Sequence, residues 1–206
     1  MRVLLLDLDG TLANTASVHK EAWEISLKRL GIEAKVNLDL LMGRRTIDIA
    51  KTLAGERYQE LFELKNAIYD ELVSTKASPL PCAKELVTRA KSKGYSTAVV
   101  TSSLRRSALR SLEAVGISPD LLIAGDEVPI GKPDPYPVYL ALDKLKGKPE
   151  QSAGVGDTIY DFQAFKRAGI RNIFIIKGLD SSVSSLIEES VTLVDTPCQV
   201  IQALNL

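Results

Sequence analysis

The spacing of the hydrophobic positions changes twice along this chain. A short apolar run at residues 3–6 (VLLL) is typical of a strand in the middle of a parallel sheet. Apolar residues then recur every three or four positions, which predicts helices over residues 16–30, 46–53 and 57–73. The Ser-Pro-Leu-Pro segment at residues 78–81 ends this pattern, because two prolines so close together do not continue a helix. A purely helical stretch therefore separates the first strand from the rest of the chain.

Beyond residue 81 the expected helices and strands alternate. This alternation predicts a parallel sheet with helices on both faces, because parallel neighbours need crossover connections. The fold class is therefore α/β, a doubly wound Rossmann-like parallel sheet with an α-helical unit inserted after strand 1. We expect the sheet unit to comprise residues 1–13 and 80–206, and the helical unit residues 14–79. The expected helices are 83–93, 104–115, 138–145 and 159–168, and the expected strands are 96–101, 121–124, 153–155 and 172–176.

Charge and composition narrow the range of partners. The 206 residues include 26 Lys and Arg and 26 Asp and Glu, and this balance favours neither nucleic acid nor an anionic membrane as a partner. No apolar run approaches the roughly 20 residues of a membrane span, and an acid follows the first apolar run too soon for a signal peptide. We therefore expect a cytoplasmic protein, a monomer or homodimer, in which Cys82 and Cys198 are reduced thiols rather than a disulfide.

The first candidate motif follows the first strand directly, at residues 7–12 (DLDGTL). Asp7 and Asp9 project from this loop to the same side, and Gly10 lets the backbone turn away. Open α/β sheets bind their ligands at the carboxyl ends of the strands. Two acids crowded there require a compensating charge, for which a cation is the simplest source. Taken alone, the same residues are also compatible with an ordinary surface turn.

Three further segments lie at the ends of expected strands. Thr101 and Ser102 follow an apolar strand and precede a helix, which indicates either an anion site at a helix N-terminus or a plain N-cap. Lys132 lies on a loop stiffened by three prolines, where the alternative is a solvated surface lysine. Asp157 and Asp161 are one helical turn apart, so they either face one site together or cap a helix.

Together, these segments place four carboxylates and one lysine at the same edge of the expected sheet. Four carboxylates cannot all stay ionised without further positive charge. A hard divalent cation with oxygen ligands, Mg²⁺ by preference, meets this requirement. With hydroxyl groups nearby for an anion, the constellation is typical of phosphoryl transfer.

The four motifs, in this order, resemble those of the haloacid dehalogenase-like (HAD) hydrolase superfamily, and the resemblance covers the whole chain. The helical unit resembles the C1-type cap of that superfamily. The resemblance implies that Asp7 is the nucleophile that becomes an aspartyl phosphate, and that Asp9 is the general acid and then the general base. It also implies that Thr101 and Ser102 bind the phosphoryl group and that Lys132 balances charge on that group and on Asp7.

The same resemblance implies a Mg²⁺ site made by the Asp7 carboxylate, the Asp9 backbone carbonyl and Asp157, with Asp161 behind them. The presence of Asp9 argues against the dehalogenase and phosphonatase branches, and Thr11 resembles the phosphatases. The implied function is Mg²⁺-dependent hydrolysis of a small phosphorylated metabolite, such as a sugar, polyol or glycolate phosphate. The alternatives are a phosphosugar mutase like the β-phosphoglucomutases and a non-catalytic regulatory protein.

Four residues of the helical unit are candidates for substrate contact. His19 and Trp23 lie four apart on one helix face, as in sugar-phosphate members of the superfamily. The alternatives are a capping or packing role for His19 and a core position for Trp23. Arg44 and Arg45 belong to a segment that resembles the cap loop of polyol- and sugar-phosphate phosphatases, although Met42 replaces a His often found there. Either arginine is a candidate for a distal hydroxyl or anion of the substrate, and solvation is the alternative.

Overall fold

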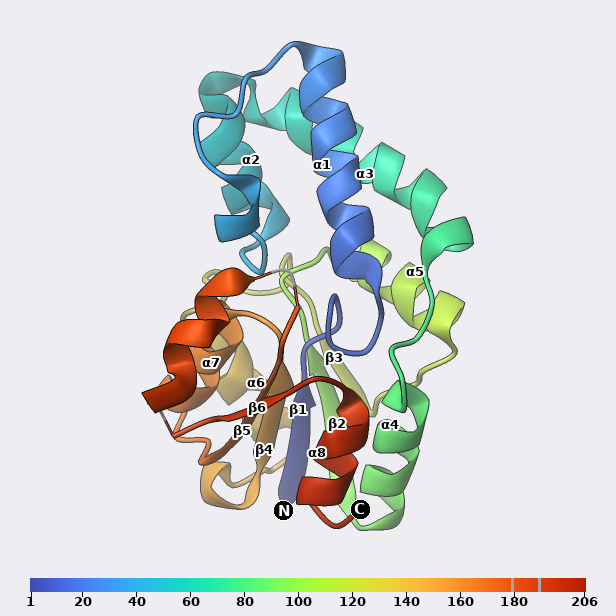
Figure 1. Cartoon of the computed structure of the whole chain (residues 1–206), viewed down its shortest axis with the longest axis vertical. Helices are drawn as coiled ribbons and strands as arrows, with labels where there is room; N and C mark the ends of the chain where they lie inside the picture. The colour runs from blue at the N-terminus through green and yellow to red at the C-terminus, as the bar shows by residue number, and fades with distance from the viewer. Residues whose placement is uncertain (179, 189) are drawn as a thin grey trace.

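A six-stranded parallel sheet is the centre of the computed structural model, which describes residues 1–178, 180–188 and 190–206 (Figure 1). The strand order is β3-β2-β1-β4-β5-β6, with helices on both faces, so the predicted doubly wound α/β fold is confirmed. The strands are β1 (Arg2–Leu6), β2 (Tyr95–Val100), β3 (Leu121–Ile123), β4 (Ala153–Gly156), β5 (Asn172–Ile176) and β6 (Thr192–Val194). The helices are α1 (Thr15–Leu30), α2 (Thr46–Ala54), α3 (Tyr58–Lys76), α4 (Ala83–Ser92), α5 (Arg105–Val115), α6 (Tyr136–Lys144), α7 (Ile159–Arg167) and α8 (Pro197–Ala203).

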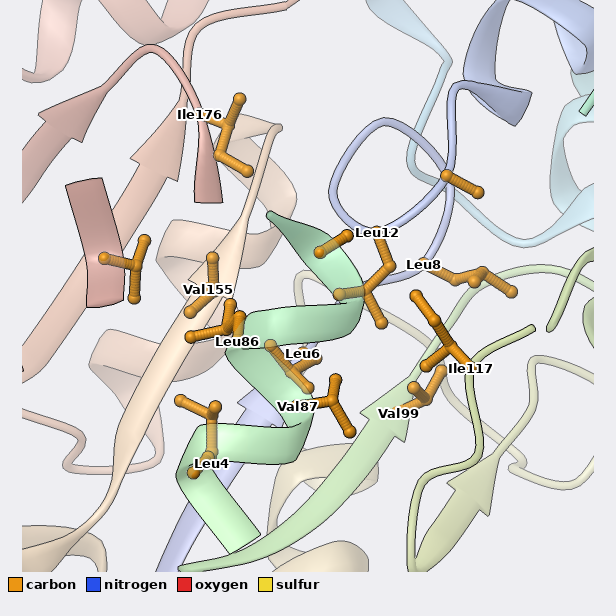
Figure 2. Packing of buried hydrophobic residues seen from close by; sticks show 14 of the residues in the cluster. Leu4, Leu6, Leu8, Leu12, Leu86, Val87, Val99, Ile117, Val155 and Ile176 are labelled. Carbon is orange, nitrogen blue, oxygen red and sulfur yellow. The ribbon is translucent and has the colours of Figure 1, made fainter. Parts of the chain in front are cut away.

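The central strand β1 is apolar on both faces because helices cover both sides of the sheet. Leu4 and Leu6 pack against residues of α4, α5 and α8, whereas Val3 and Leu5 pack against residues of α6 and α7. All four side chains are fully buried. Figure 2 shows the first of these two faces, where Leu4 and Leu6 lie beside Leu86 of α4. The continuous apolar run of β1 is thus what a doubly covered parallel strand requires. The strand ends at Leu6, directly before Asp7.

Helices α1, α2 and α3 form a separate layer over the carboxyl edge of the sheet (Figure 1). The layer has a core of its own, in which Trp23, Ile49 and Leu61 are buried together. The two connections between this layer and the sheet run side by side. The Asn14 N–H donates to the Ser78 carbonyl at 3.0 Å, and the Ser78 N–H donates to Asn14 Oδ1 at 2.7 Å. None of the helices in the described ranges is long and apolar enough to cross a membrane.

Cys82 and Cys198 form a disulfide bond, so the expectation of reduced thiols was wrong. Cys82 immediately precedes α4 and Cys198 lies in the first turn of α8. The two helices pack side by side on the same face of the sheet (Figure 1). This packing brings the two Cα atoms to 5.1 Å although 116 positions separate them in the sequence. The expectation failed because it used sequence separation, whereas the spatial proximity of α4 and α8 decides the pairing.

Candidate active site

Loops at the carboxyl ends of the strands bring the predicted core residues together. Asp7 follows β1, Asp157 follows β4, and Asp161 lies in the first turn of α7. Lys132 lies on the loop between β3 and α6, and all four side chains are buried. Between this edge and the helical layer is a cavity of about 50 Å³, whose lining includes Asp7, Asp157 and Thr101. The sheet edge and the helical layer therefore enclose one small polar site.

Lys132 is a buried ammonium that joins two carboxylates. Its Nζ donates hydrogen bonds of 2.6 Å to Asp7 Oδ1 and 2.6 Å to Asp161 Oδ1, and one of 3.1 Å to the Val100 carbonyl. Burial alone would lower the pKa of Lys132, but the charges of Asp161 and Asp7 outweigh it and raise the pKa above its usual range. Lys132 is therefore a fixed positive charge directly beside Asp7.

Asp161 is oriented by the start of α7. Its Oδ2 accepts a hydrogen bond from the Thr158 N–H at 3.1 Å, and its own N–H donates to Thr158 Oγ1 at 3.3 Å, which together form a capping box. Thr158 Oγ1 also lies 2.7 Å from Asp161 Oδ2. The Asp157 N–H also donates to this oxygen, at 3.3 Å. Because Lys132 occupies the other oxygen, Asp161 is held in one orientation behind Asp157. The same residue thus caps a helix and positions the lysine.

Three of the buried carboxylates fit a divalent cation. Oxygen atoms of Asp7, Asp157 and Asp161 lie within 4.8 Å of one another. Burial and the neighbouring carboxylates outweigh the charge of Lys132. They raise the pKa of Asp7 to about 7 and that of Asp157 well above its usual range. Gly10, at φ +92°, makes room for this group, since a Cβ there would lie 2.1 Å from Asp157 Oδ2. Such an all-oxygen acidic set is the donor type that hard divalent cations prefer.

Asp9 faces the helical layer rather than Lys132. Its Oδ1 accepts a hydrogen bond from Thr15 Oγ1 at 2.5 Å and lies 3.3 Å from His19 Nε2. Its Oδ2 accepts from Ser103 Oγ at 2.7 Å and from Thr101 Oγ1 at 3.3 Å. Burial would raise the pKa of Asp9, but His19 and the hydroxyl donors outweigh it and hold the pKa well below its usual range. Asp9 is therefore a fully ionised, firmly oriented carboxylate.

Behind Asp9, His19 is held by a buried lysine of α3. Lys65 Nζ lies 2.8 Å from His19 Nδ1, and the His19 ring stacks on Tyr69 with 3.7 Å between the ring centroids. Because an ammonium only donates, a protonated Lys65 makes Nδ1 the acceptor and leaves the ring proton on Nε2, which faces Asp9. Burial and the Lys65 charge lower the pKa of His19, and burial lowers that of Lys65 to about 7. A neutral His19 thus links α3 to Asp9.

Replacing Lys65 by Met is expected to separate stability from activity. Because the folded-state pKa of Lys65, about 7, lies below its ordinary value of 10.5, wild-type stability should rise with pH between these values, and the variant should lack that rise. At pH 7 the free energy of unfolding of the variant should equal that of wild type or exceed it by about 1–2 kcal/mol, because a buried charge is removed. Turnover should fall on the order of 10²-fold as His19 loses its orientation. Denaturant unfolding at several pH values, with exposed Lys28→Met as control, checks this; an equal loss of stability and activity would contradict it.

The predicted contacts in the helical layer divide into two groups. His19, Trp23 and Arg44 line the cavity, and Trp23 is also 1% exposed in the core of the layer. Arg45 does not line the cavity, because its guanidinium is bonded to Asp48 and to two backbone carbonyls of the sheet unit.

Ser102, in the sheet unit, also lines the cavity, and its Oγ donates to the carbonyl of residue 43 at 2.6 Å. Both hydroxyl residues of the second motif are thus at the cavity.

Sequence reasoning missed four residues of the site. Thr15 and Ser103 donate to Asp9, Lys65 holds His19, and buried Asp180 lines the cavity and accepts from the first N–H of α7 at 2.9 Å. A signal existed for two of them. Ser103 completes a run of three hydroxyl residues after β2, and Lys65 interrupts the buried stripe of α3. A lysine in such a stripe is rarely buried without a partner, so its position points to one.

Comparison with known proteins agrees with this geometry. A model of the haloacid dehalogenase-like hydrolase family matches residues 4–175, and the chain therefore belongs to this family. It is 36% identical over 187 residues to a phosphoglycolate phosphatase of Aquifex aeolicus, covering 86% of each chain. The predicted family and class of enzyme, a phosphatase of this family, are thereby confirmed.

Solved structures share the fold over the full length of the chain. A hydrolase from Pseudomonas syringae superposes with a TM-score of 0.87 at 21% identity, covering 100% of this chain and 98% of the other. CbbY from Rhodobacter sphaeroides in complex with phosphate superposes with a TM-score of 0.84 at 24% identity, covering both chains completely. At these identities the structures establish the shared architecture.

Proposed function

We propose that this chain is a Mg²⁺-dependent phosphomonoester hydrolase that acts on a small phosphorylated metabolite through an aspartyl phosphate on Asp7. The observation that carries the proposal is the placement of Asp7, which lies at the end of β1 with Lys132 at 2.6 Å and Asp157 beside it. A carboxylate attacks an anionic phosphate ester only when positive charge masks the repulsion. This site supplies one buried ammonium and the ligands for a cation.

The two acids of the first motif divide the chemistry between them. Asp7 would attack phosphorus and displace the alkoxide leaving group. Asp9 would donate a proton to this alkoxide. Asp9 would then remove a proton from the water that attacks phosphorus of the aspartyl phosphate. The bond between phosphorus and Asp7 breaks, which releases inorganic phosphate and regenerates the Asp7 carboxylate. The ionised state of Asp9 suits the second step, and a bound phosphate dianion next to it favours the proton needed in the first. Thr101 and Ser102, which line the cavity, would lie against the phosphoryl oxygens.

Mg²⁺ would be held by the carboxylates of Asp7 and Asp157 and by the backbone carbonyl of Asp9. When bound, it would neutralise charge on the phosphoryl group. Asp161 would keep Asp157 and Lys132 in place from behind, because its own oxygens already accept hydrogen bonds from Lys132 and Thr158. The pairing of this acid with the lysine leaves the other two carboxylates for the cation.

Residues 14–79 would act as a cap over a catalytic core of residues 1–13 and 80–206. The paired connections at Asn14 and Ser78 are the natural hinge, because two adjacent backbone segments there carry all the covalent links between the units. Opening at this hinge would admit substrate, and closure would exclude bulk water.

A cytoplasmic location and a monomeric or homodimeric state stay predictions. The disulfide bears on the first of these, because disulfides are uncommon in the cytosol outside hyperthermophiles.

Arg44 is the residue that we expect to select the substrate. It lines the cavity from the cap, and its guanidinium has no hydrogen-bond or ion-pair partner among the described residues. A substrate with a second anionic group, such as 2-phosphoglycolate, would provide the partner, and the Aquifex aeolicus relative is named for that substrate. A hydrogen-bonded ion pair of this kind corresponds to roughly 10- to 100-fold in binding.

Phosphate release from 2-phosphoglycolate, ethyl phosphate and a hexose phosphate tests both the proposed reaction and the proposed role of Arg44. Wild type should hydrolyse 2-phosphoglycolate with the highest kcat/KM, and Arg44→Gln should lower that value about 10- to 100-fold while changing ethyl phosphate hydrolysis little. Exposed Arg29→Gln is the matched control and should change neither. An equal loss on both substrates in the Arg44 variant would contradict anion recognition by this residue. No release from any ester would contradict the proposed reaction.

A further inference from the structure

The loop before α2 makes a second set of contacts between the cap and the core, in addition to the hinge. We call residues 40–45 the docking loop. The Leu40 carbonyl accepts a hydrogen bond from Tyr160 Oη at 2.7 Å, and the Gly43 carbonyl accepts one from Ser102 Oγ at 2.6 Å. Arg45 makes the third attachment. The docking loop therefore joins the cap to three separate parts of the core.

All three guanidinium nitrogens of Arg45 donate hydrogen bonds, and together these bonds fix the orientation of the group. Its Nε and Nη2 donate to the two carboxylate oxygens of Asp48 at 2.7 Å and 3.1 Å, which fixes the plane of the group. Its Nη1 donates to the carbonyls of Val128 and Pro129 at 2.9 Å and 2.8 Å. Only 19% of the side chain is exposed. A single lysine ammonium does not reproduce this planar bridge.

Both carbonyls belong to the loop that carries Lys132. The Arg45 side chain also lies flat over Gly131, since a Cβ on that glycine would be 2.5 Å from Arg45 Cγ. Gly131 immediately precedes Lys132, whose Nζ bonds Asp7. The cap therefore touches the chain one residue away from the lysine that sets the charge at the nucleophile.

We propose that Arg45 is a positioning residue that couples docking of the cap to the placement of Lys132 against Asp7. This inference rests on the proposed function. When the cap lifts at its hinge, the two carbonyls lose their donor and Gly131 loses its cover, so the loop that carries Lys132 is released. When the cap docks over substrate, Arg45 restrains the loop from residue 128 to residue 131 and the lysine is held at its 2.6 Å contact. The positive charge of Lys132 is then held beside Asp7 only when the substrate is enclosed.

A double-mutant cycle between Arg45 and Gly131 tests the coupling. Arg45→Ala removes the contact from the cap side. Gly131→Ala displaces it from the core side, and the Gly131 backbone does not require glycine by its φ angle. Each single variant should lower kcat for 2-phosphoglycolate about 10- to 100-fold with a smaller change in KM, and Arg45→Lys should restore little. The double variant should be no slower than the slower single variant, because both changes break one contact.

Arg57→Ala is the matched control, because Arg57 also precedes a helix, pairs with the acid three residues on and reaches a carbonyl, but all within the cap. It should keep wild-type kcat. Amide hydrogen exchange gives a readout that needs no turnover: exchange over residues 126–136 should speed up in Arg45→Ala and not in Arg57→Ala. Unchanged exchange there, an unchanged kcat in Arg45→Ala, or multiplicative losses in the double variant would overturn the inference. Absence of phosphate release by wild type would instead contradict the proposed function, and hydrogen exchange would still decide the coupling.

Discussion

Asp7→Asn is expected to abolish phosphate release while leaving the fold intact. The amide has nearly the shape of the carboxylate, and its oxygen can still accept the hydrogen bond from Lys132. It carries no charge and is a poor nucleophile, so no aspartyl phosphate forms and turnover should fall on the order of 10³-fold or more. The fold should not be weakened, because the raised pKa of Asp7 shows that its buried charge is unfavourable without a cation.

Phosphate release and thermal unfolding of the variant, measured side by side, check both halves of this result. The melting temperature without metal should equal or exceed that of wild type. Asp143→Asn, on an exposed side chain of α6, is the matched control and should change neither quantity. Residual activity above a few per cent of wild type, with a folded variant free of wild-type contamination, would contradict the assignment of Asp7 as nucleophile.

Loss of the Cys82–Cys198 disulfide is expected to have the largest effect on stability. The bond closes a loop across 116 positions of the chain and ties α8, at the end of the sheet unit, to the start of α4. The chain-entropy model assigns a loop of this length about 5 kcal/mol of stabilisation through the unfolded state. For a domain of this size that corresponds to a fall in melting temperature of roughly 10–20 °C.

The matched comparison for the disulfide is wild type in oxidised and reduced form beside Cys82→Ser. The reduced protein and the variant should melt at the same lowered temperature, and a reductant should change nothing further in the variant. Neither cysteine takes part in the contact between Asp7 and Lys132, so kcat should be retained at temperatures where both forms are folded. Equal melting of oxidised and reduced wild type would contradict a stabilising disulfide.

The sheet and the grouping of acids at its carboxyl edge were predictable from local patterns. The apolar run of β1 needs no tertiary information, because a strand covered on both faces is apolar at every position. The acids that follow β1 and β4 then meet at one edge as a consequence of parallel pairing, which aligns Leu6 with Val155. Residues that directly follow parallel strands therefore lie close together in space, although they are far apart in the sequence.

The parts that escaped prediction depend on contacts between distant segments. Lys65 and His19 are 46 positions apart and meet only because α1 and α3 pack together. The disulfide depends in the same way on α4 and α8. Strand β6 and helix α8 were not foreseen at all, because a three-residue strand and a seven-residue helix are too short for a clear hydrophobic period. Arg45 was one of two candidate arginines for substrate contact, and no sequence pattern indicated that its guanidinium bonds two carbonyls of a core loop 83 and 84 positions away.

The central claim is a metal-dependent phosphomonoesterase that uses Asp7. Inorganic phosphate released from 2-phosphoglycolate, measured with Mg²⁺, with EDTA and with Mg²⁺ restored, tests it most directly when Asp7→Asn is run in parallel. The account predicts release with Mg²⁺, loss with EDTA, recovery on restoring the metal, and no release by the variant under any condition. Release that is unaffected by EDTA, or equal release by the variant, would contradict the account.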